Sequence, residues 1–386
     1  MDVLPLRAEV ARREVSFLEA LEDMVNIDCG SFSPDGVNHI ADRCEQRFRE
    51  GGWQVERRPH VPADGEAPLG DLVIGTLRGD GGSRVLLVGH MDTVFDEGTA
   101  AARPFRIEGG IARGPGVSDM KAGLLAGFAA VEALQQAGST SFDRITYVCN
   151  PDEEVGSPFS GPVIRELAPS HDVAFVLECA RANGDIVSAR KGVTDHVVVF
   201  RGLAAHAGVE PEKGRHAVLA AARATVALQA LNGRWPGVSV NVGVSRGGTR
   251  PNVVPDLAEL QVDLRATTWE AQETAEAEIV RACQDAIEEG VTVEVRADGW
   301  HRPMERSAAS ARLVERAVAI AGDLGFSVRD AATGGASDGN TTSAAGTPTL
   351  DGLGPIGGAA HAVDEWLDVA SITPRVSLLA GLIASA

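Results

Sequence analysis

A short apolar segment that ends in a histidine most strongly limits what this chain can fold into. Residues Val85–Gly89 are five apolar or small residues in a row, which is typical of a buried strand. His90 follows directly, and Asp92 comes two positions later. Ligands bind at the carboxyl ends of strands in an open α/β sheet, where one ring nitrogen could bind a metal while Asp92 accepts a hydrogen bond from the other. A loop histidine beside a turn aspartate is the alternative that this motif alone leaves open.

Two later strands also end at acidic residues. The segment Arg144–Cys149 is followed by Glu153 and Glu154, and the segment Val173–Leu177 is followed by Glu178. Helices are predicted between these strands, and this alternation indicates a mainly parallel sheet flanked by helices. An acidic turn is usually solvated or lies at a helix N-terminus. An acid directly after five apolar residues, in contrast, would be costly to bury unpaired.

The pattern changes at about residue 191. From there the chain reads strand, helix, strand, strand, helix, strand, which is the order of a ferredoxin-like α+β unit. The alternation of strands and helices resumes at about Ser307. We therefore predict a discontinuous catalytic domain, residues 1–190 and 301–386, interrupted by an inserted domain at residues 191–300.

Charge and cysteine content exclude several classes of protein. The 386 residues include 35 Lys and Arg against 54 Asp and Glu, a formal net charge of −19, so we expect neither a nucleic acid nor a membrane as a partner. The five cysteines have no C-x-x-C spacing and predict neither a disulfide framework nor a cysteine zinc site. No apolar run reaches about 18 residues and the N-terminal segment lacks an apolar signal core, which favours a cytoplasmic location.

Seven short segments, spread over nearly the whole chain, form a specific combination. They are Gly89–Val94, Gly114–Gly123, Asp152–Gly156, Leu177–Glu178, Ala205–Gly208, Arg250–Pro255 and the Gly-rich loop with His361. In this order and spacing they resemble the co-catalytic zinc peptidase family that includes carboxypeptidase G, the aminoacylases and the desuccinylases. The likeness is greatest to the glutamate carboxypeptidase branch. It implies a catalytic domain of the zinc exopeptidase type and an insert that acts as a dimerisation domain.

The resemblance also implies two zinc ions per subunit, for which Co²⁺ or Mn²⁺ could substitute. One ion would be held by His90, Asp119 and Glu178, and the other by the shared Asp119 together with Glu154 and His361. The chemistry of such sites agrees, because two neighbouring ions need a bridging carboxylate and terminal ligands on each. Zinc accepts both histidine nitrogen and carboxylate oxygen.

Three further residues would take part in catalysis by the same resemblance. Glu153 would remove a proton from the attacking water and carry it to the leaving amine, and Asp92 would orient the histidine ligand. His206, in the inserted domain, would reach the active site of the partner subunit and stabilise the oxyanion. The peptide bond Asp119–Met120 would be cis, as in the family.

The substrate carboxylate would be bound by Asn252, Arg265 and the backbone N–H groups of Gly334 and Gly335. The planar fork of an arginine can bind a carboxylate through two hydrogen bonds, and glycine permits a close approach. A salt bridge from Arg265 to Asp263 is the alternative. Glutamate-specific relatives carry a further lysine soon after the last acidic ligand, and this chain has no clear counterpart there, which leaves the released amino acid open.

Together these features predict a homodimeric two-zinc carboxypeptidase or related amide hydrolase. It would release a C-terminal amino acid with a free α-carboxylate from a small N-acyl amino acid, peptide or folate-like substrate. Two alternatives remain: an aminoacylase that removes simple acyl groups, and a binding protein on an inactive peptidase scaffold. The presence of all five expected ligands and of Glu153 argues against the second alternative.

Overall fold

The computed structural model describes residues 3–386, apart from the side chains at positions 298 and 300. The chain divides into two compact units, and each has its own architecture. Unit 1 comprises the chain up to Ser188, Arg306–Ala332 and Ser337–Ala386, and unit 2 comprises Ala189–Glu305 and Thr333–Ala336. The predicted domain boundaries differ from those of the units chiefly at residues 333–336, which lie in unit 2 and not in unit 1.

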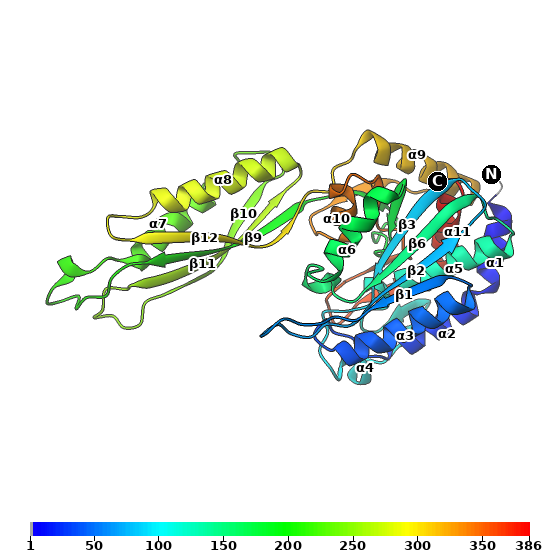
Figure 1. The fold of residues 1–386 in the computed structure, drawn as a ribbon, viewed down its shortest axis with the longest axis horizontal. Helices are drawn as coiled ribbons and strands as arrows, with labels where there is room; N and C mark the ends of the chain where they lie inside the picture. Colours follow the sequence, from blue (N-terminus) through cyan, green and yellow to red (C-terminus); the bar gives the residue numbers. More distant parts are fainter. Residues whose placement is uncertain (1–2) are drawn as a thin grey trace. The chain divides into compact units, whose positions relative to one another are not determined.

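Unit 1 is built on a six-stranded sheet in the order β1-β2-β6-β3-β7-β14 (Figure 1). The strands are β1 (Gln54–Arg58), β2 (Leu72–Arg78), β3 (Ser83–His90), β6 (Phe142–Asn150), β7 (Val173–Val176) and β14 (Thr349–Leu350). Strands β6, β3, β7 and β14 are parallel, whereas β2 pairs antiparallel with both β6 and β1. This is the predicted mainly parallel α/β sheet, and it brings the carboxyl ends of β3, β6 and β7 to one edge.

Helices cover both faces of this sheet. Val85 and Leu87 of β3 belong to the core on one face, whereas Leu86 and Val88 pack on the other with Ile164 of helix α6 (Ser160–Leu167). This alternation follows from strand geometry, in which successive side chains point to opposite faces. The helices of unit 1 are α1 (Leu4–Arg12), α2 (Glu14–Val25), α3 (Pro34–Glu50), α4 (Thr99–Ala102), α5 (Ala122–Gln136), α6 (Ser160–Leu167), α9 (Ala308–Asp323), α10 (Asp338–Ala344) and α11 (Ile372–Ala384).

A second, small sheet in unit 1 is not evident from the sequence. It has the order β15-β16-β5-β4 and consists of β15 (Gly357–Gly358), β16 (Trp366–Asp368), β5 (Ile111–Arg113) and β4 (Arg106–Glu108). Strands of two or three residues are too short to show a periodicity of side chains. The pairing of β5 with β16 brings the segment before Asp119 beside the segment after His361.

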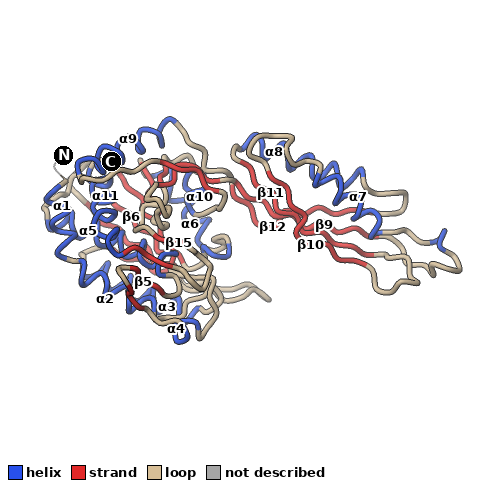
Figure 2. The backbone as a smooth tube through the Cα atoms, turned by 180° about the vertical axis from the view of Figure 1, so that it is seen from behind, coloured by secondary structure: helices blue, strands red, loops and turns tan. Residues whose placement is uncertain are grey.

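Unit 2 has the ferredoxin-like order that the sequence predicts. Its elements are β9 (Gly192–Arg201), α7 (Ala217–Gln229), β10 (Ser239–Gly247), β11 (Leu257–Ala266), α8 (Trp269–Asp285) and β12 (Thr292–His301). The strands form an antiparallel sheet in the order β10-β11-β9-β12, and both helices lie along one face (Figures 1 and 2). Alternate residues of β11, from Ala258 to Ala266, are buried in the core beneath the helices.

Two further strands, β8 (Ile186–Arg190) and β13 (Asp330–Thr333), form a separate two-stranded sheet.

Within the described residues, every helix is too short or too polar to span a bilayer.

Candidate metal centre

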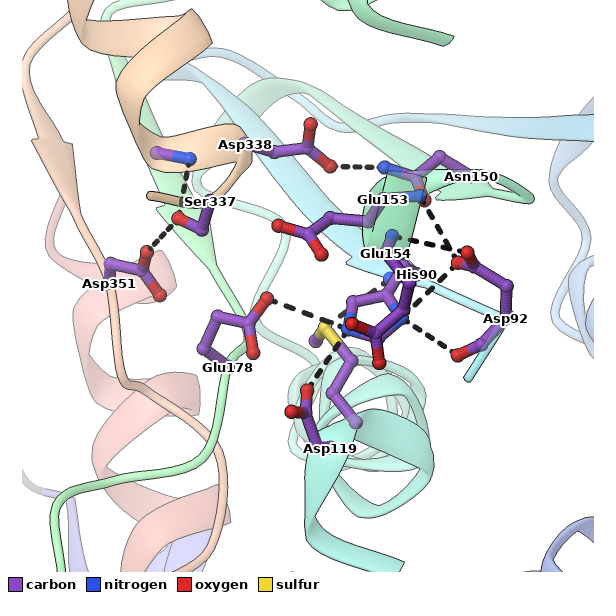
Figure 3. A network of polar contacts seen from close by, with 12 residues as sticks. His90, Asp92, Asp119, Asn150, Glu153, Glu154, Glu178, Ser337, Asp338 and Asp351 are labelled. Atoms are coloured by element: carbon purple, nitrogen blue, oxygen red, sulfur yellow. Dashed lines mark hydrogen bonds and ion pairs between the residues drawn. The ribbon is translucent and has the colours of Figure 1, made fainter. Parts of the chain in front are cut away.

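His90 is the last residue of β3, and only 1% of its side chain is exposed. Its Nδ1 lies 3.0 Å from the backbone carbonyl oxygen of Asp92 and 3.4 Å from Oδ1 of the same residue. Its Nε2 lies 3.2 Å from Asp119 Oδ1 and 3.6 Å from Glu178 Oε1. Figure 3 shows Asp92 on one side of the ring and the two other acids on the opposite side. A proton on Nδ1 would leave the Nε2 lone pair directed at the acidic side.

The Asp92 carboxylate organises more of the site than the sequence analysis predicts. Its Oδ1 accepts a hydrogen bond from the N–H of Glu153 at 3.2 Å, and its Oδ2 accepts one from the N–H of Glu154 at 3.1 Å. The Ser31 hydroxyl donates to Oδ2 at 2.6 Å. The shorter contact of His90 is with the Asp92 carbonyl rather than with its carboxylate. Asp92 therefore holds the turn after β6 against the end of β3.

Asp119 directs one carboxylate oxygen toward each of two histidines. Its Oδ1 lies 3.2 Å from His90 Nε2, and its Oδ2 lies 3.2 Å from His361 Nε2. The same nitrogen of His361 is 3.0 Å from Glu154 Oε2. The five predicted ligands therefore form two groups that share Asp119, one containing His90 and Glu178 and the other containing His361 and Glu154.

Irregular backbone and a close helix approach place Asp119 in this position. The peptide bond Asp119–Met120 is cis, as the family resemblance predicts. Gly123, in the first turn of α5, packs against the carbonyl oxygen of Leu177, which precedes Glu178. A Cβ at position 123 would lie 1.8 Å from that oxygen. Glycine is therefore required where the helix that follows Asp119 meets the strand end that carries Glu178.

Burial and crowded charges shift the pKa values of these groups. Burial and the charge of Glu178 raise the pKa of Glu153 well above its ordinary value. Burial also raises the pKa of Glu154, although its hydrogen bond with His361 opposes this. Hydrogen bonds with Asp119 and Glu154 raise the pKa of His361 to about 10. A bound divalent cation would stabilise the ionised carboxylates in such a cluster.

The donor set fits divalent metal ions. His90, Asp119 and Glu154 offer ligand atoms that lie within 4.8 Å of one another, as do His90, Glu153 and Glu178. Glu154 Oε1 is buried and has no hydrogen-bond partner among the described residues, an arrangement that a cation would relieve. Histidine nitrogen and carboxylate oxygen are ligands that zinc accepts. Glu153, predicted not to bind metal, lies close enough to be a sixth ligand.

The other predicted site residues lie in unit 2. His206 and Asn252 are both exposed and are neighbours, because the N–H of Ala207 donates to the Asn252 carbonyl oxygen at 3.0 Å. His206 also forms an isolated antiparallel bridge with Val253.

Arg265 has partners within unit 2. Its guanidinium lies 3.0 Å from Asp263 Oδ2, the salt bridge that the sequence analysis leaves open, and donates to the Gly334 carbonyl oxygen at 2.9 Å. Arg190, which the sequence analysis does not single out, donates to the Gly335 carbonyl oxygen at 3.2 Å. These bonds join both glycines to side chains of unit 2, to which they belong, although the sequence analysis places them in the catalytic domain.

Comparison with known proteins identifies the family of this chain. The profile of Peptidase family M20/M25/M40 matches residues 86–385, and the chain belongs to this family. Its members are metal-dependent peptidases and amidohydrolases, usually with zinc, so the chain is an enzyme of this class.

Relatives with different names match most of the chain. Carboxypeptidase G2 from Pseudomonas sp. (strain RS-16) is 29% identical over 372 residues, which cover 95% of this chain and 88% of that protein. Succinyl-diaminopimelate desuccinylase from Dechloromonas aromatica (strain RCB) is 25% identical over 372 residues, covering 92% and 94%. The crystal structure of aminopeptidase PepT from Bacillus cereus ATCC 10987 aligns with a TM-score of 0.81 at 23% identity, covering 96% and 98%. These names describe three different activities, so the family alone does not define the substrate.

Proposed function

We propose that the chain is a two-zinc amide hydrolase of the carboxypeptidase type, which releases an amino acid with a free α-carboxylate. The observation that carries the proposal is that the two carboxylate oxygens of Asp119 face His90 and His361, each at 3.2 Å. A carboxylate that bridges two metals needs this disposition. Glu178 would complete the first half of the centre and Glu154 the second. When bound, the ions would polarise the scissile amide and lower the pKa of a water molecule.

Glu153 is the proposed general acid–base. It begins the 3₁₀ turn Glu153–Val155 and lies close to His90 and Glu178. Burial raises the pKa of its carboxyl, whereas bound cations would lower it, and a carboxyl balanced between these two effects can take a proton from water and then deliver it to the leaving amine.

The α-carboxylate of the released residue would be bound in unit 2 by Arg265, Asn252 and the N–H groups of Gly334 and Gly335. A Cβ at either glycine would meet open space, so packing within the chain does not require glycine at these positions. Glycine at these two positions would instead allow a ligand to approach the backbone closely. The Arg265 side chain is 37% exposed, which leaves its guanidinium able to bind a second carboxylate besides Asp263.

Amidation of the substrate's C-terminus tests this assignment. It should lower kcat/KM of the native enzyme by about 10–100-fold, because it removes the charged partner of Arg265, and hydrogen bonds to charged groups contribute about 1.5–3 kcal/mol. Arg265→Ala should penalise the free acid by a similar factor and the amide little. Arg296→Ala is the matched control, because Arg296 also pairs with an acid two residues before it on a strand of the same sheet. Equal cleavage of both substrates by the native enzyme would contradict the carboxypeptidase assignment.

An N-acyl amino acid deacylase is the second candidate, favoured by the similarity to the desuccinylase over 92% of this chain. Substrates that share one C-terminal residue but carry N-acetyl, N-succinyl, peptidyl or pteroyl groups separate the two candidates. The ratios of kcat/KM across this set would identify the acyl donor. Bound metal without hydrolysis of any substrate would favour the inactive binding protein.

We also propose that unit 2 forms the homodimer and supplies His206 to the active site of the partner subunit. The exposure of His206 and its position beside Asn252 support this proposal. Glu153→Ala and His206→Ala chains, each inactive alone, should regain activity after subunit exchange, because one site of each mixed dimer would have both residues. Proven exchange without recovery would argue against sharing.

A further inference from the structure

Glu365 is a buried carboxylate to which neither the sequence analysis nor the proposed reaction assigns a role. Only 1% of the residue is exposed. Its Oε1 accepts hydrogen bonds from the N–H of Ser118 at 2.8 Å, from the Ser118 hydroxyl at 3.0 Å and from the N–H of Asp119 at 3.0 Å. Its Oε2 accepts a hydrogen bond from the N–H of Gly116 at 2.8 Å. All four donors therefore belong to the short segment that ends at Asp119.

The backbone of this segment is too irregular for its N–H groups to form the hydrogen bonds of a regular helix. Gly116 is left-handed with φ of 70°, and Asp119 has φ of −117° and ψ of 90°. A buried N–H without an acceptor is costly, and Glu365 provides the acceptor for three of them. The carboxylate thus compensates for the irregular turn that presents Asp119.

Asp119 is consequently held at both of its ends. Its N–H is bonded to Glu365 at 3.0 Å, and its carboxylate oxygens each lie 3.2 Å from a histidine. A shift of the backbone at Asp119 would change both of the latter distances, because the side chain is short.

Glu365 also belongs to the loop that carries the second histidine. It comes four residues after His361, and its N–H donates to the Ala362 carbonyl oxygen at 3.3 Å. The next residue, Trp366, begins β16, which pairs with β5. One carboxylate therefore joins the loop of His361 to the loop of Asp119 directly, through its own side chain.

We propose that Glu365 is a positioning residue that sets the spacing between Asp119 and His361 and thereby strengthens metal binding at the centre. The inference rests on the proposed two-metal function. The alternative is a purely structural carboxylate that stabilises the fold without affecting the centre.

Glu365→Gln separates the two roles, because it keeps the shape of the side chain. A glutamine side chain has only one acceptor oxygen. Its NH₂ group would therefore face at least one N–H group that now donates a hydrogen bond to Glu365, and that hydrogen bond would be lost. Ser118→Ala is a milder variant that removes only the hydroxyl donor. Asp28→Asn is the matched control, since Asp28 accepts hydrogen bonds from the N–H groups of Gly98 and Ala100, at the start of the short helix α4, which carries none of the proposed ligands.

The experiment titrates the metal-depleted full chain with Zn²⁺ by calorimetry and with Co²⁺ by visible absorption, alongside thermal unfolding without metal. Glu365→Gln should lower metal affinity by about 10–100-fold and alter the Co²⁺ spectrum, as loss of a residue that orients a ligand does. Ser118→Ala should also lower the metal affinity and alter the Co²⁺ spectrum, but by smaller amounts than Glu365→Gln. Asp28→Asn should lower the unfolding temperature and leave metal affinity unchanged.

Native affinity and spectrum in Glu365→Gln would overturn the inference, even if its unfolding temperature fell. If Glu365→Gln does not fold, Ser118→Ala decides in its place, and native affinity in that variant would overturn the inference. Failure of the native chain to bind any metal would instead overturn the proposed function, so the two failures are distinguishable.

Discussion

The two halves of the proposed metal centre share Asp119 but hold their histidines in different ways. His90 ends a strand, has 1% of its side chain exposed and has Nδ1 fixed against Asp92. His361 lies in a loop with a left-handed φ of 63°, and 56% of its side chain is exposed. Both histidines lie 3.2 Å from Asp119, so distance does not distinguish them. The two histidines therefore have similar distances to Asp119, but His90 is held in place much more rigidly than His361. This difference should appear as a difference in metal affinity between the two halves.

The largest effect is expected where the halves meet. Asp119→Ala should remove a ligand from both halves, so metal content should fall well below two ions per chain. The fall in kcat/KM should be larger than the fall of about 10²–10⁴-fold that follows the loss of a general acid–base group. Elemental analysis and kinetics on one preparation measure both. Retention of two ions would show that the halves do not depend on this carboxylate.

Glu153 belongs to neither half in the proposed function. Glu153→Ala should lower kcat by about 10²–10⁴-fold while metal content stays near that of the native chain. Because His90, Glu153 and Glu178 also lie close enough to form a ligand group, metal content is the decisive measurement. A variant that loses one ion together with its activity would assign Glu153 to the first half as a ligand.

A smaller effect concerns the order in which the halves lose metal. Dialysis against a graded chelator should remove one ion before the other, with affinities that differ by about 10–100-fold, because only the first half is held rigidly. His361→Ala should retain one ion with affinity near that of the tighter native site. Simultaneous loss of both ions from the native chain would show that the two halves act as a single unit.

The smallest effect is a dependence on pH that only the second half should show. Hydrogen bonds with Asp119 and Glu154 raise the pKa of His361 to about 10. In the metal-depleted chain, His361 should stabilise the fold fully below the unfolded histidine pKa of about 6.5, and this contribution should be lost as pH rises through about 10. The unfolding temperature of native protein minus that of His361→Gln should therefore shrink from pH 6 to pH 10. The difference should be small and sensitive to salt, because the ring is half exposed.

The metal-loaded chain is the control for this titration, because a bound metal must displace the histidine proton. Metal affinity at the second half should accordingly rise with pH up to about 10. A difference in unfolding temperature that stays constant with pH in the metal-depleted chain would contradict the ion pairs at His361.

The contrast between the halves also shows what the sequence can predict. His90 and Glu178 follow abrupt ends of apolar segments, so strand geometry alone places them at one edge of the sheet. His361 lies in a Gly-rich loop without periodicity and could be assigned only through resemblance to a family. The split of the chain near residue 191 was predictable as well, because the order of strands and helices changes there.

Contacts between distant segments could not be predicted from the sequence. Glu365 lies in the loop after His361, and its partners are three N–H groups and one hydroxyl of a segment 246 to 249 residues earlier, where no sequence pattern marks them. Arg190 and Arg265 of unit 2 likewise donate to the backbone carbonyl oxygens of Gly335 and Gly334, which the sequence does not indicate. In both cases the side chain is visible in the sequence, but most of its hydrogen-bond partners are backbone groups, which almost every residue type supplies.

The discontinuity of unit 1 has a consequence for the order in which the chain can fold during synthesis. The helices and four-stranded sheet of unit 2 come from one continuous segment, Ala189–Glu305, so this sheet can close soon after β12 leaves the ribosome. Unit 1 cannot do the same, because residues of α9 and α11 belong to the same core as those of α1 and α5. The apolar face of its sheet and the helix α5 cannot be covered by α9 and α11 until more than a hundred intervening residues have been synthesised. During that interval the nascent chain would carry an exposed apolar surface, so we expect the first half of unit 1 to be prone to aggregation until the rest of the unit has been made.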